Sequence, residues 1–226
     1  MGRRARLVLS GVPLHIIQRG NNRNACFIAE VDYRVYLSML REASTAVDCS
    51  IHAYVLMTNH VHLLVSAEDI SSPSILMKAL GQRFAQYINR RYRRTGTLWE
   101  GRFRSCLVEG EPYLLTCQRY IELNPVRAGM VTRPDEYHWS SYRANAEGCI
   151  DPLVTPHELY SRLGAEPCER QAVYRQLFDD EISAETIASL RHATNGNYAM
   201  ATVPFLEHAR CLLGRGVSPP SFCRRT

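Results

Sequence analysis

Two histidines and a tyrosine are the residues of this chain whose types and spacing could perform chemistry. His60 and His62 flank Val61 at the start of a short apolar run. Alternation along a strand sends both imidazoles to one face, where two neutral rings form half of a divalent-metal site. In a chain with 8 histidines, a His-x-His pattern also arises by chance in roughly one case in four, so a structural role stays open.

Tyr120 and Asn124 lie one helical turn apart in residues 113–124, a segment with helical periodicity. Its apolar stripe, which we expect to face a sheet, is formed by Leu114, Cys117, Gln118 and Ile121. Tyr120 lies on the shoulder of that stripe and Asn124 follows on the same side, so both could address one site. Tyr120 could equally be an ordinary half-buried aromatic. Because Pro125 follows Asn124, spacing alone favours the asparagine as the cap of a new helix.

Arginines interleaved with aromatic residues form a third group. The arginines of the central segment are Arg83, Arg90, Arg91, Arg93, Arg94, Arg102 and Arg104. The aromatic residues among them are Tyr87, Tyr92, Trp99 and Phe103. Guanidinium groups bind phosphates and aromatic rings stack on unpaired bases, which is typical of proteins that bind single-stranded nucleic acid. Arg19 and Arg23, beside a predicted turn, would extend this surface, although a solvated helix face explains the same residues.

A ferredoxin-like α+β fold would position these groups. The predicted strands cover residues 14–19, 50–57, 61–66 and 103–109, and the predicted helices cover 31–47, 74–92 and 110–124. This β-α-β-β-α-β order, followed by a helix, predicts an antiparallel sheet with helices on one face. We expect this domain to span residues 1–145. Residues 146–226 would form a helical C-terminal extension, with helices at 170–190 and 204–213 and a disordered tail, SPPSFCRRT.

Composition places the chain among soluble, reduced proteins. It has 226 residues, of which 46% are hydrophobic, and no apolar run approaches the length of a membrane helix. The eight cysteines lack metal or redox spacing, and no segment resembles a signal peptide, so we expect a cytoplasmic protein. Residues 1–150 carry 19 Lys and Arg against 13 Asp and Glu, so the excess positive charge lies in the predicted domain.

Five segments together resemble a known family, the REP-associated tyrosine transposases of the single-tyrosine HUH group, where HUH means His, hydrophobic residue, His. The segments are LHIIQRGNNR, HAYVLMTNHVHLLV, GTLWEGRFRSCLVE, RYIELNPVRAGMV and WSSYRA, in that order. The resemblance implies that His60 and His62 are metal ligands and that Tyr120 is the nucleophile. It also implies that Asn124 is the third metal ligand, whereas spacing alone favours this residue as a helix cap. The cofactor implied by the resemblance is Mg²⁺ or Mn²⁺.

The resemblance further implies a DNA endonuclease and strand-transferase that acts on single-stranded, hairpin-forming repeats, the repetitive extragenic palindromes of bacterial genomes. Tyrosine would attack the scissile phosphate and leave a 5′-phosphotyrosine and a free 3′-hydroxyl. A phenol is mostly protonated at neutral pH, so cleavage needs a nearby cation or base, and the sequence names no base. From charge, the expected strand contacts are Arg19, Arg23, Arg90, Arg91, Arg93, Arg94, Arg102 and Arg104.

Three other functions remain open at this stage. An RNA-recognition domain has the same strand order, but this chain lacks its aromatic strand signature. A domesticated relative could bind repeat DNA as a regulator without cutting it, although His60, His62 and Tyr120 are intact. A metal-dependent hydrolase without covalent chemistry would stay active after Tyr120→Phe. We expect a monomer or homodimer associated with the nucleoid and with no membrane.

Overall fold

Antiparallel strand pairing organises the chain in the computed structural model, which describes residues 4–219. The strands are β1 (Leu14–Arg19), β2 (Ser50–Met57), β3 (His60–Ser66), β4 (Arg104–Val108) and β5 (Ala199–Met200). They form one sheet in the order β2-β3-β1-β4-β5, in which only β4 and β5 run parallel. The order of the first four strands confirms the predicted ferredoxin-like arrangement. β5 is an addition, and with two residues it is too short to leave a periodic pattern in the sequence.

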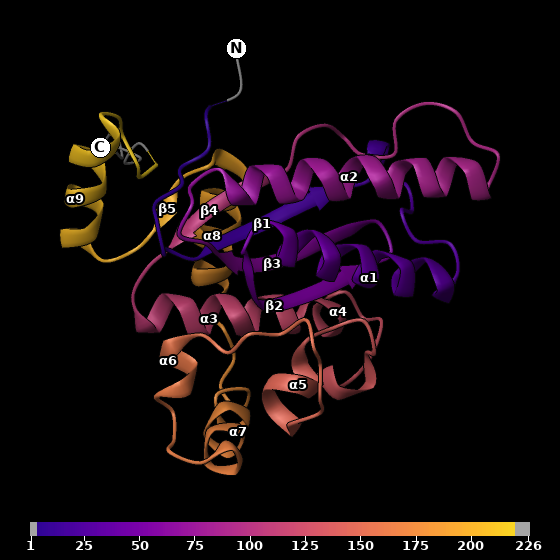
Figure 1. The fold of residues 1–226 in the computed structure, drawn as a ribbon. Helices are drawn as coiled ribbons and strands as arrows, with labels where there is room; N and C mark the ends of the chain where they lie inside the picture. Colours follow the sequence, from indigo (N-terminus) through magenta and orange to yellow (C-terminus); the bar gives the residue numbers. More distant parts are fainter. Residues whose placement is uncertain (1–3, 220–226) are drawn as a thin grey trace.

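Helices cover both faces of the sheet, not the one face that the sequence predicts, because helices that follow β4 pack on the second face (Figure 1). α1 (Glu30–Ala46) and α2 (Ser72–Arg91) pack together on one face, whereas α3 (Glu111–Glu122) and α8 (Ala184–Gly196) lie against the other. The remaining helices are α4 (Asn124–Arg127), α5 (Tyr142–Glu147), α6 (Glu158–Ser161), α7 (Pro167–Gln176) and α9 (Val203–Leu213), with short 3-10 turns η1 (Asn21–Arg23) and η2 (Pro134–Glu136). Within the described residues, no helix is both long and apolar enough to cross a membrane.

The β2-β3 hairpin fixes which way the two histidines point. A two-residue turn, Thr58 and Asn59, joins the strands. It is one residue shorter than the predicted strands imply, because β3 begins at His60 and not at residue 61. His60 pairs with Arg19 of β1, and His62 pairs with Ile17. Since side chains alternate along a strand, the imidazoles share one face of the sheet, and this face is the one that α3 and α8 cover.

Each face of the sheet has its own hydrophobic core. Leu14 and Ile16 of β1 join the core beneath α1 and α2, where Tyr36 and Phe84 are fully buried. On the opposite face, a second core forms between the sheet and α3, and the four residues of the predicted helical stripe are all buried. The stripe therefore faces the sheet as expected, which holds the flank of α3 at a fixed height above the strands.

The C-terminal helices differ from the prediction at one place. The sequence predicts helix throughout 170–190, but α7 ends at Gln176 and α8 begins at Ala184. The interruption arises because Ser183 caps α8, its hydroxyl accepting a hydrogen bond from the backbone N–H of Thr186. The predicted helix at 204–213 matches α9. Residues 220–226 of the predicted disordered tail lie outside the described part of the chain.

The cysteines in residues 4–219 are all free. Four of them are buried, namely Cys26, Cys49, Cys106 and Cys117, and they pack as small hydrophobic side chains.

A buried carboxyl group joins α3 to the segment that follows it. Glu122 is fully buried and accepts hydrogen bonds from Ser141 Oγ (2.6 Å), Asn145 Nδ2 (2.8 Å) and Tyr174 Oη (2.8 Å). Ser141 also hydrogen bonds to the backbone of Tyr54 on the edge strand β2. Burial raises the pKa of Glu122 from its ordinary value of 4.5 to about 7, against the effect of the three donors. The network therefore ties α3, α5 and α7 to the sheet edge.

We predict that Glu122 makes the free energy of unfolding depend on pH. Its folded pKa is raised, so its contribution is complete below pH 4.5 and is lost as pH rises through about 7. The change should be on the order of 3 kcal/mol. Glu122→Gln should remove this loss, as measured by denaturant unfolding of both proteins between pH 5 and pH 8. Glu111→Gln, an exposed change at the other end of α3, serves as the control, and a wild-type pH slope that persists in Glu122→Gln would contradict the assignment.

Candidate active site

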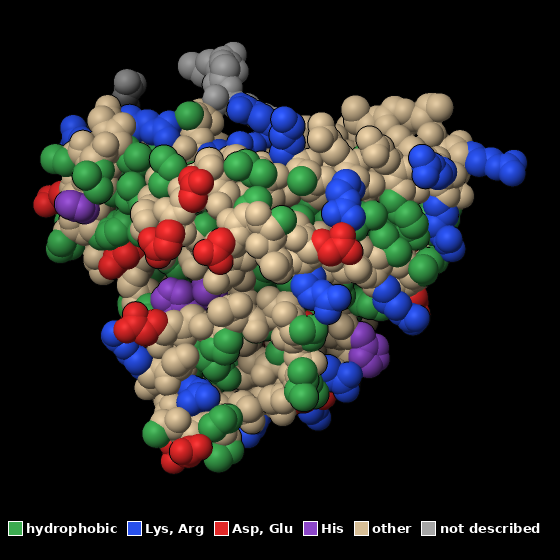
Figure 2. Space-filling model, in the orientation of Figure 1, with side chains coloured by type: hydrophobic (Ala, Val, Ile, Leu, Met, Phe, Trp, Pro, Cys, Tyr) green, Lys and Arg blue, Asp and Glu red, His purple; other side chains and the backbone are tan. Residues whose placement is uncertain are grey.

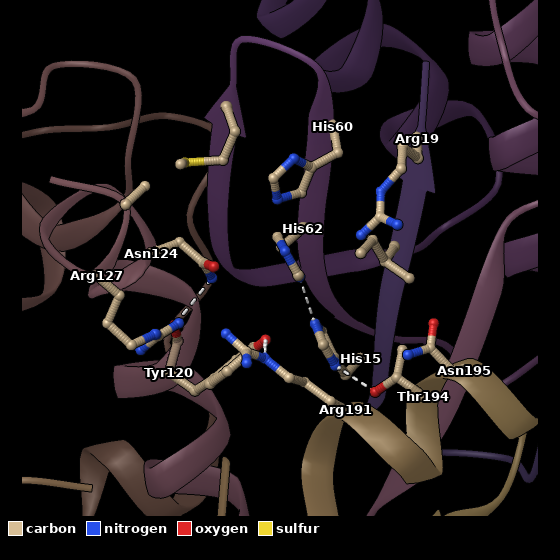
Figure 3. A pocket seen from close by; sticks show the side chains of 13 residues that line it. His15, Arg19, His60, His62, Tyr120, Asn124, Arg127, Arg191, Thr194 and Asn195 are labelled. Atoms are coloured by element: carbon tan, nitrogen blue, oxygen red, sulfur yellow. Dashed lines mark hydrogen bonds between the residues drawn. The ribbon is translucent and has the colours of Figure 1, made fainter. Parts of the chain in front are cut away.

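A cavity of about 330 Å³ opens where β1 and β3 meet α3 and α8 (Figure 3). The predicted site residues His60, His62, Tyr120 and Asn124 all line it, although they are up to 64 positions apart in the chain. Arg19 is the one predicted DNA contact that reaches the same cavity. The fold therefore brings together the four side chains that the sequence singled out for chemistry.

The two imidazoles stand side by side with one nitrogen of each ring already engaged. Their ring centroids are 5.0 Å apart. His60 Nδ1 lies 2.6 Å from the side-chain oxygen of Asn59, and His62 Nδ1 lies 2.8 Å from His15 Nε2. Because Nδ1 is occupied in both rings, Nε2 is the nitrogen that remains for the cavity. Burial, assisted by Arg19, lowers the pKa of His60 to about 4, and burial lowers that of His62 well below its ordinary value. Both rings are therefore neutral near pH 7 and can offer a lone pair.

Asn124 is the first residue of α4 and does not cap it. α4 begins without a side-chain cap, and the amide nitrogen of Asn124 instead donates to the carbonyl oxygens of Tyr120 (2.9 Å) and Ile121 (3.2 Å). The side chain thus satisfies carbonyl groups at the end of α3, so the cap favoured by spacing is wrong. With its nitrogen committed to these bonds, the amide has its oxygen free for the cavity, opposite the histidines (Figure 3).

The donor set suits a hard divalent cation. In residues 4–219, no cluster of three or more His, Cys, Asp or Glu side chains is arranged to hold a metal. Two neutral imidazoles and one amide oxygen are nevertheless suitable ligands for Mg²⁺ or Mn²⁺, which complete their coordination with water or substrate oxygens. The side chains that the sequence nominates as ligands therefore fit such an ion.

Tyr120 is held against the cavity wall by aromatic and cationic neighbours. Only 4% of its surface is exposed. The His62 ring stands edge-on to the tyrosine ring at a centroid separation of 5.9 Å, and the guanidinium carbon of Arg127 lies 4.1 Å from the centre of the tyrosine ring. Arg191 of α8 places its Nε 3.4 Å from the phenol oxygen. A negative charge on that oxygen would therefore face two cations.

Arg127 has unpaired N–H donors at the cavity. Its Nη2 donates to the carbonyl oxygen of Tyr120 at 2.6 Å, while Nε and Nη1 are buried and have no partner in the described part of the chain. Burial is the main cause that lowers the pKa of Arg127 below its ordinary value. Burying unpaired N–H donors of a cation costs free energy unless an anion accepts their hydrogen bonds. A phosphate oxygen has the charge and geometry to accept them.

The predicted DNA-binding arginines separate into two regions. Arg102 and Arg104 line a small hollow that adjoins the cavity and shares Arg19 with it. Arg90 and Arg91 lie at the end of α2, Arg93 and Arg94 follow in the next loop, and Arg23 lies in η1. In Figure 2, Lys and Arg side chains gather along the upper edge and around the end of α2, whereas acidic side chains lie across the middle of this face.

The sequence analysis missed several polar side chains of the cavity, among them His15, Arg127 and Arg191. His15 could have been found, because it precedes Arg19 by four residues on a strand and therefore shares its face. Arg127 follows Asn124 by three residues, a spacing that keeps both on one side of a short helix. Arg191 could not have been found, since it lies 71 positions from Tyr120 and nothing local to it indicates the contact.

Comparison with known proteins supports the resemblance. The described fold aligns with the structure of a REP-associated tyrosine transposase bound to a REP hairpin, with a TM-score of 0.57, 16% identity, and coverage of 70% of this chain and 93% of that one. A protein from Deinococcus radiodurans, named as a transposase, aligns with a TM-score of 0.38 and 21% identity over 54% of this chain and 96% of its own.

No protein with a curated function matches the chain. The family model for IS200-like transposases matches residues 8–124, which is more than half of the chain and contains all four strands of the ferredoxin-like sheet, His60, His62, Tyr120 and Asn124. The chain therefore belongs to the family of IS200-like transposases.

Proposed function

We propose that this transposase is a single-strand DNA endonuclease and strand-transferase that cuts and rejoins hairpin-forming repeat DNA through Tyr120. The observation that carries the proposal is the cavity itself. It combines a tyrosine hydroxyl, two neutral imidazoles with available Nε2 atoms, an amide oxygen and three arginines. A hydroxyl beside cations and metal-type ligands suits attack on a phosphodiester.

His60, His62 and Asn124 would hold one Mg²⁺ or Mn²⁺ ion. When bound, the ion would polarise the scissile phosphate and neutralise part of the charge that develops on it. The ligands are already oriented without the ion, because His60 is tied to Asn59, His62 to His15, and Asn124 to the end of α3. Little reorganisation of these side chains would be needed when the ion binds.

Three protein side chains would carry out the cleavage reaction itself. Tyr120 Oη would attack phosphorus in line, forming the tyrosyl ester while the bond from phosphorus to the 3′ oxygen breaks. The tyrosine hydroxyl loses its proton to solvent on attack, and the leaving 3′ oxygen takes one up. The products are a 5′-phosphotyrosine and a 3′-hydroxyl, and the reverse reaction rejoins strands. Arg191 would stabilise the phenolate that attacks, and the free Nε and Nη1 of Arg127 would bind a phosphate oxygen.

Single-stranded hairpin DNA is the substrate that best fits the surroundings of the cavity. Arg19 inside it and Arg102 and Arg104 beside it would guide the backbone toward Tyr120. The structurally similar transposase is bound to a REP hairpin, which is a DNA of the same class. We therefore assign a repeat hairpin of the host genome as the partner, with the arginines at the end of α2 as a second contact region.

We predict that the full-length protein forms a covalent adduct with labelled single-stranded hairpin repeats in the presence of Mn²⁺ or Mg²⁺. Tyr120→Phe should abolish the adduct because the ring keeps its packing but loses the attacking oxygen. Denaturing gels would detect the adduct, and peptide mass spectrometry would place the nucleotide on Tyr120. Tyr113→Phe, in the same helix but outside the cavity lining, should leave the adduct unchanged.

Two results of this assay would favour other functions. Cleavage that survives in Tyr120→Phe would identify a hydrolase in which water or another residue is the nucleophile. Specific hairpin binding without adduct or cleavage, with either metal, would identify a regulator that has lost the reaction.

We further predict that both arginine regions contact the phosphate backbone. Replacing Arg102 and Arg104 together by glutamine, or Arg90 and Arg93 together, should weaken binding of the Tyr120→Phe protein to hairpin DNA. Each pair should also reduce the magnitude of the slope of log affinity against log salt by about 1.4, since each of the two phosphate contacts on single-stranded DNA contributes roughly 0.7 to it. Fluorescence anisotropy at several salt concentrations measures this. Arg34→Gln is the control, because Arg34 is exposed on α1 and pairs with Glu30, and a slope equal to the control would remove a region from the interface.

A further inference from the structure

A chain of hydrogen bonds leads from the backbone of α8 to the ring of His62. The Thr194 hydroxyl lies 2.8 Å from the carbonyl oxygen of Leu190, one turn earlier in α8. The same hydroxyl lies 2.9 Å from His15 Nδ1, and His15 Nε2 lies 2.8 Å from His62 Nδ1. The His15 and His62 rings are stacked, with their planes only 6° apart and their centroids 5.1 Å apart (Figure 3).

Counting hydrogens along this chain gives it a direction. A hydroxyl has one hydrogen, and the Leu190 carbonyl oxygen can only accept, so the Thr194 hydroxyl donates to it. Thr194 must therefore accept from His15 Nδ1–H. A neutral His15 then has a bare Nε2, which accepts from His62 Nδ1–H, and a neutral His62 is left with a lone pair on Nε2. Both rings are at most 2% exposed, and neither has a carboxylate partner in the described part of the chain, which favours the neutral forms.

We propose that His15 and Thr194 are positioning residues that lock His62 in the tautomer with its hydrogen on Nδ1, so that Nε2 faces the cavity as a lone-pair donor. Thr194 belongs to α8, so this helix would take part in positioning His62 although it lies outside the segment matched by the family model. The use of that lone pair for a cation rests on the function proposed above. The tautomer itself does not, because it follows from contacts made without any ligand.

The placement of Thr194 is fixed independently of the site. α8 ends in a left-handed residue, Asn197, whose side-chain oxygen accepts a hydrogen bond from the backbone N–H of Ser105 in β4 at 3.0 Å. Next to it, Asn195 accepts from Arg104 at 2.8 Å. These contacts hold the last turns of α8 along β4, next to β1, and so keep the Thr194 hydroxyl within reach of His15.

Nitrogen NMR of the full chain, labelled with ¹⁵N-histidine and kept free of metal and DNA, tests the proposal. Nδ1 and Nε2 have different shifts according to which one carries the hydrogen. Wild-type His62 should show a single tautomer with its hydrogen on Nδ1. Thr194→Val keeps the shape of the side chain but removes the hydroxyl, and it should convert His62 to a mixture of tautomers. Thr194→Ser retains the hydroxyl and should restore the wild-type spectrum.

Mn²⁺ titration of the same three proteins, followed by electron paramagnetic resonance, gives a second readout. Loss of such an outer partner typically weakens metal binding 10- to 100-fold, so Thr194→Val should bind Mn²⁺ about tenfold or more weakly, and Thr194→Ser should bind like wild type. Wild-type His62 with its hydrogen on Nε2, or an unchanged tautomer in a folded Thr194→Val protein, would overturn the proposal. A correct tautomer in a protein that forms no adduct with DNA would instead count against the proposed function alone.

Discussion

The antiparallel pairing of β1 with β3 is the constraint on which the rest of the site depends. Its register sets Ile17 opposite His62 and Arg19 opposite His60, so that Arg19 and the two histidines rise from one face of the sheet. A shift by one residue would turn His60 and His62 into the core beneath α1 and α2 and expose apolar residues in their place. The buried residues of the opposite face, such as Leu14 and Ile16, oppose that shift and thereby fix the register.

Two helices, α3 and α8, enclose the cavity above β1 and β3. The apolar stripe of α3 anchors it to the sheet and leaves Tyr120 on the flank that borders the histidines. α8 closes the other side and contributes Arg191 and Thr194, one turn apart on a single face. The cavity is therefore lined from both the segment matched by the family model and the C-terminal region, and contacts between elements orient His15 and Tyr120 within it.

The sequence predicts those parts of the site that local periodicity controls. Strand alternation places His60 and His62 together, and helical spacing places Tyr120 beside Asn124, because both depend only on neighbours in the chain. The interpretation of Asn124 as a cap fails because the side chain reaches back to the carbonyl groups of α3, a choice that tertiary packing decides. The contacts of Arg191 and Thr194 with Tyr120 and His15 join positions 71 and 179 residues apart, so no pattern within a segment could indicate them.

The central claim is that His60, His62 and Asn124 form one cation site next to the hydroxyl of Tyr120. Anomalous X-ray scattering from crystals of the full chain grown with Mn²⁺ tests it most directly. We predict one strong peak in the cavity, about 2.1 Å from His60 Nε2, His62 Nε2 and the side-chain oxygen of Asn124. Three results would contradict this claim. The Mn²⁺ ion could be bound by Nδ1 of either ring, it could lack Asn124 as a ligand, or the only peak could lie outside an empty cavity.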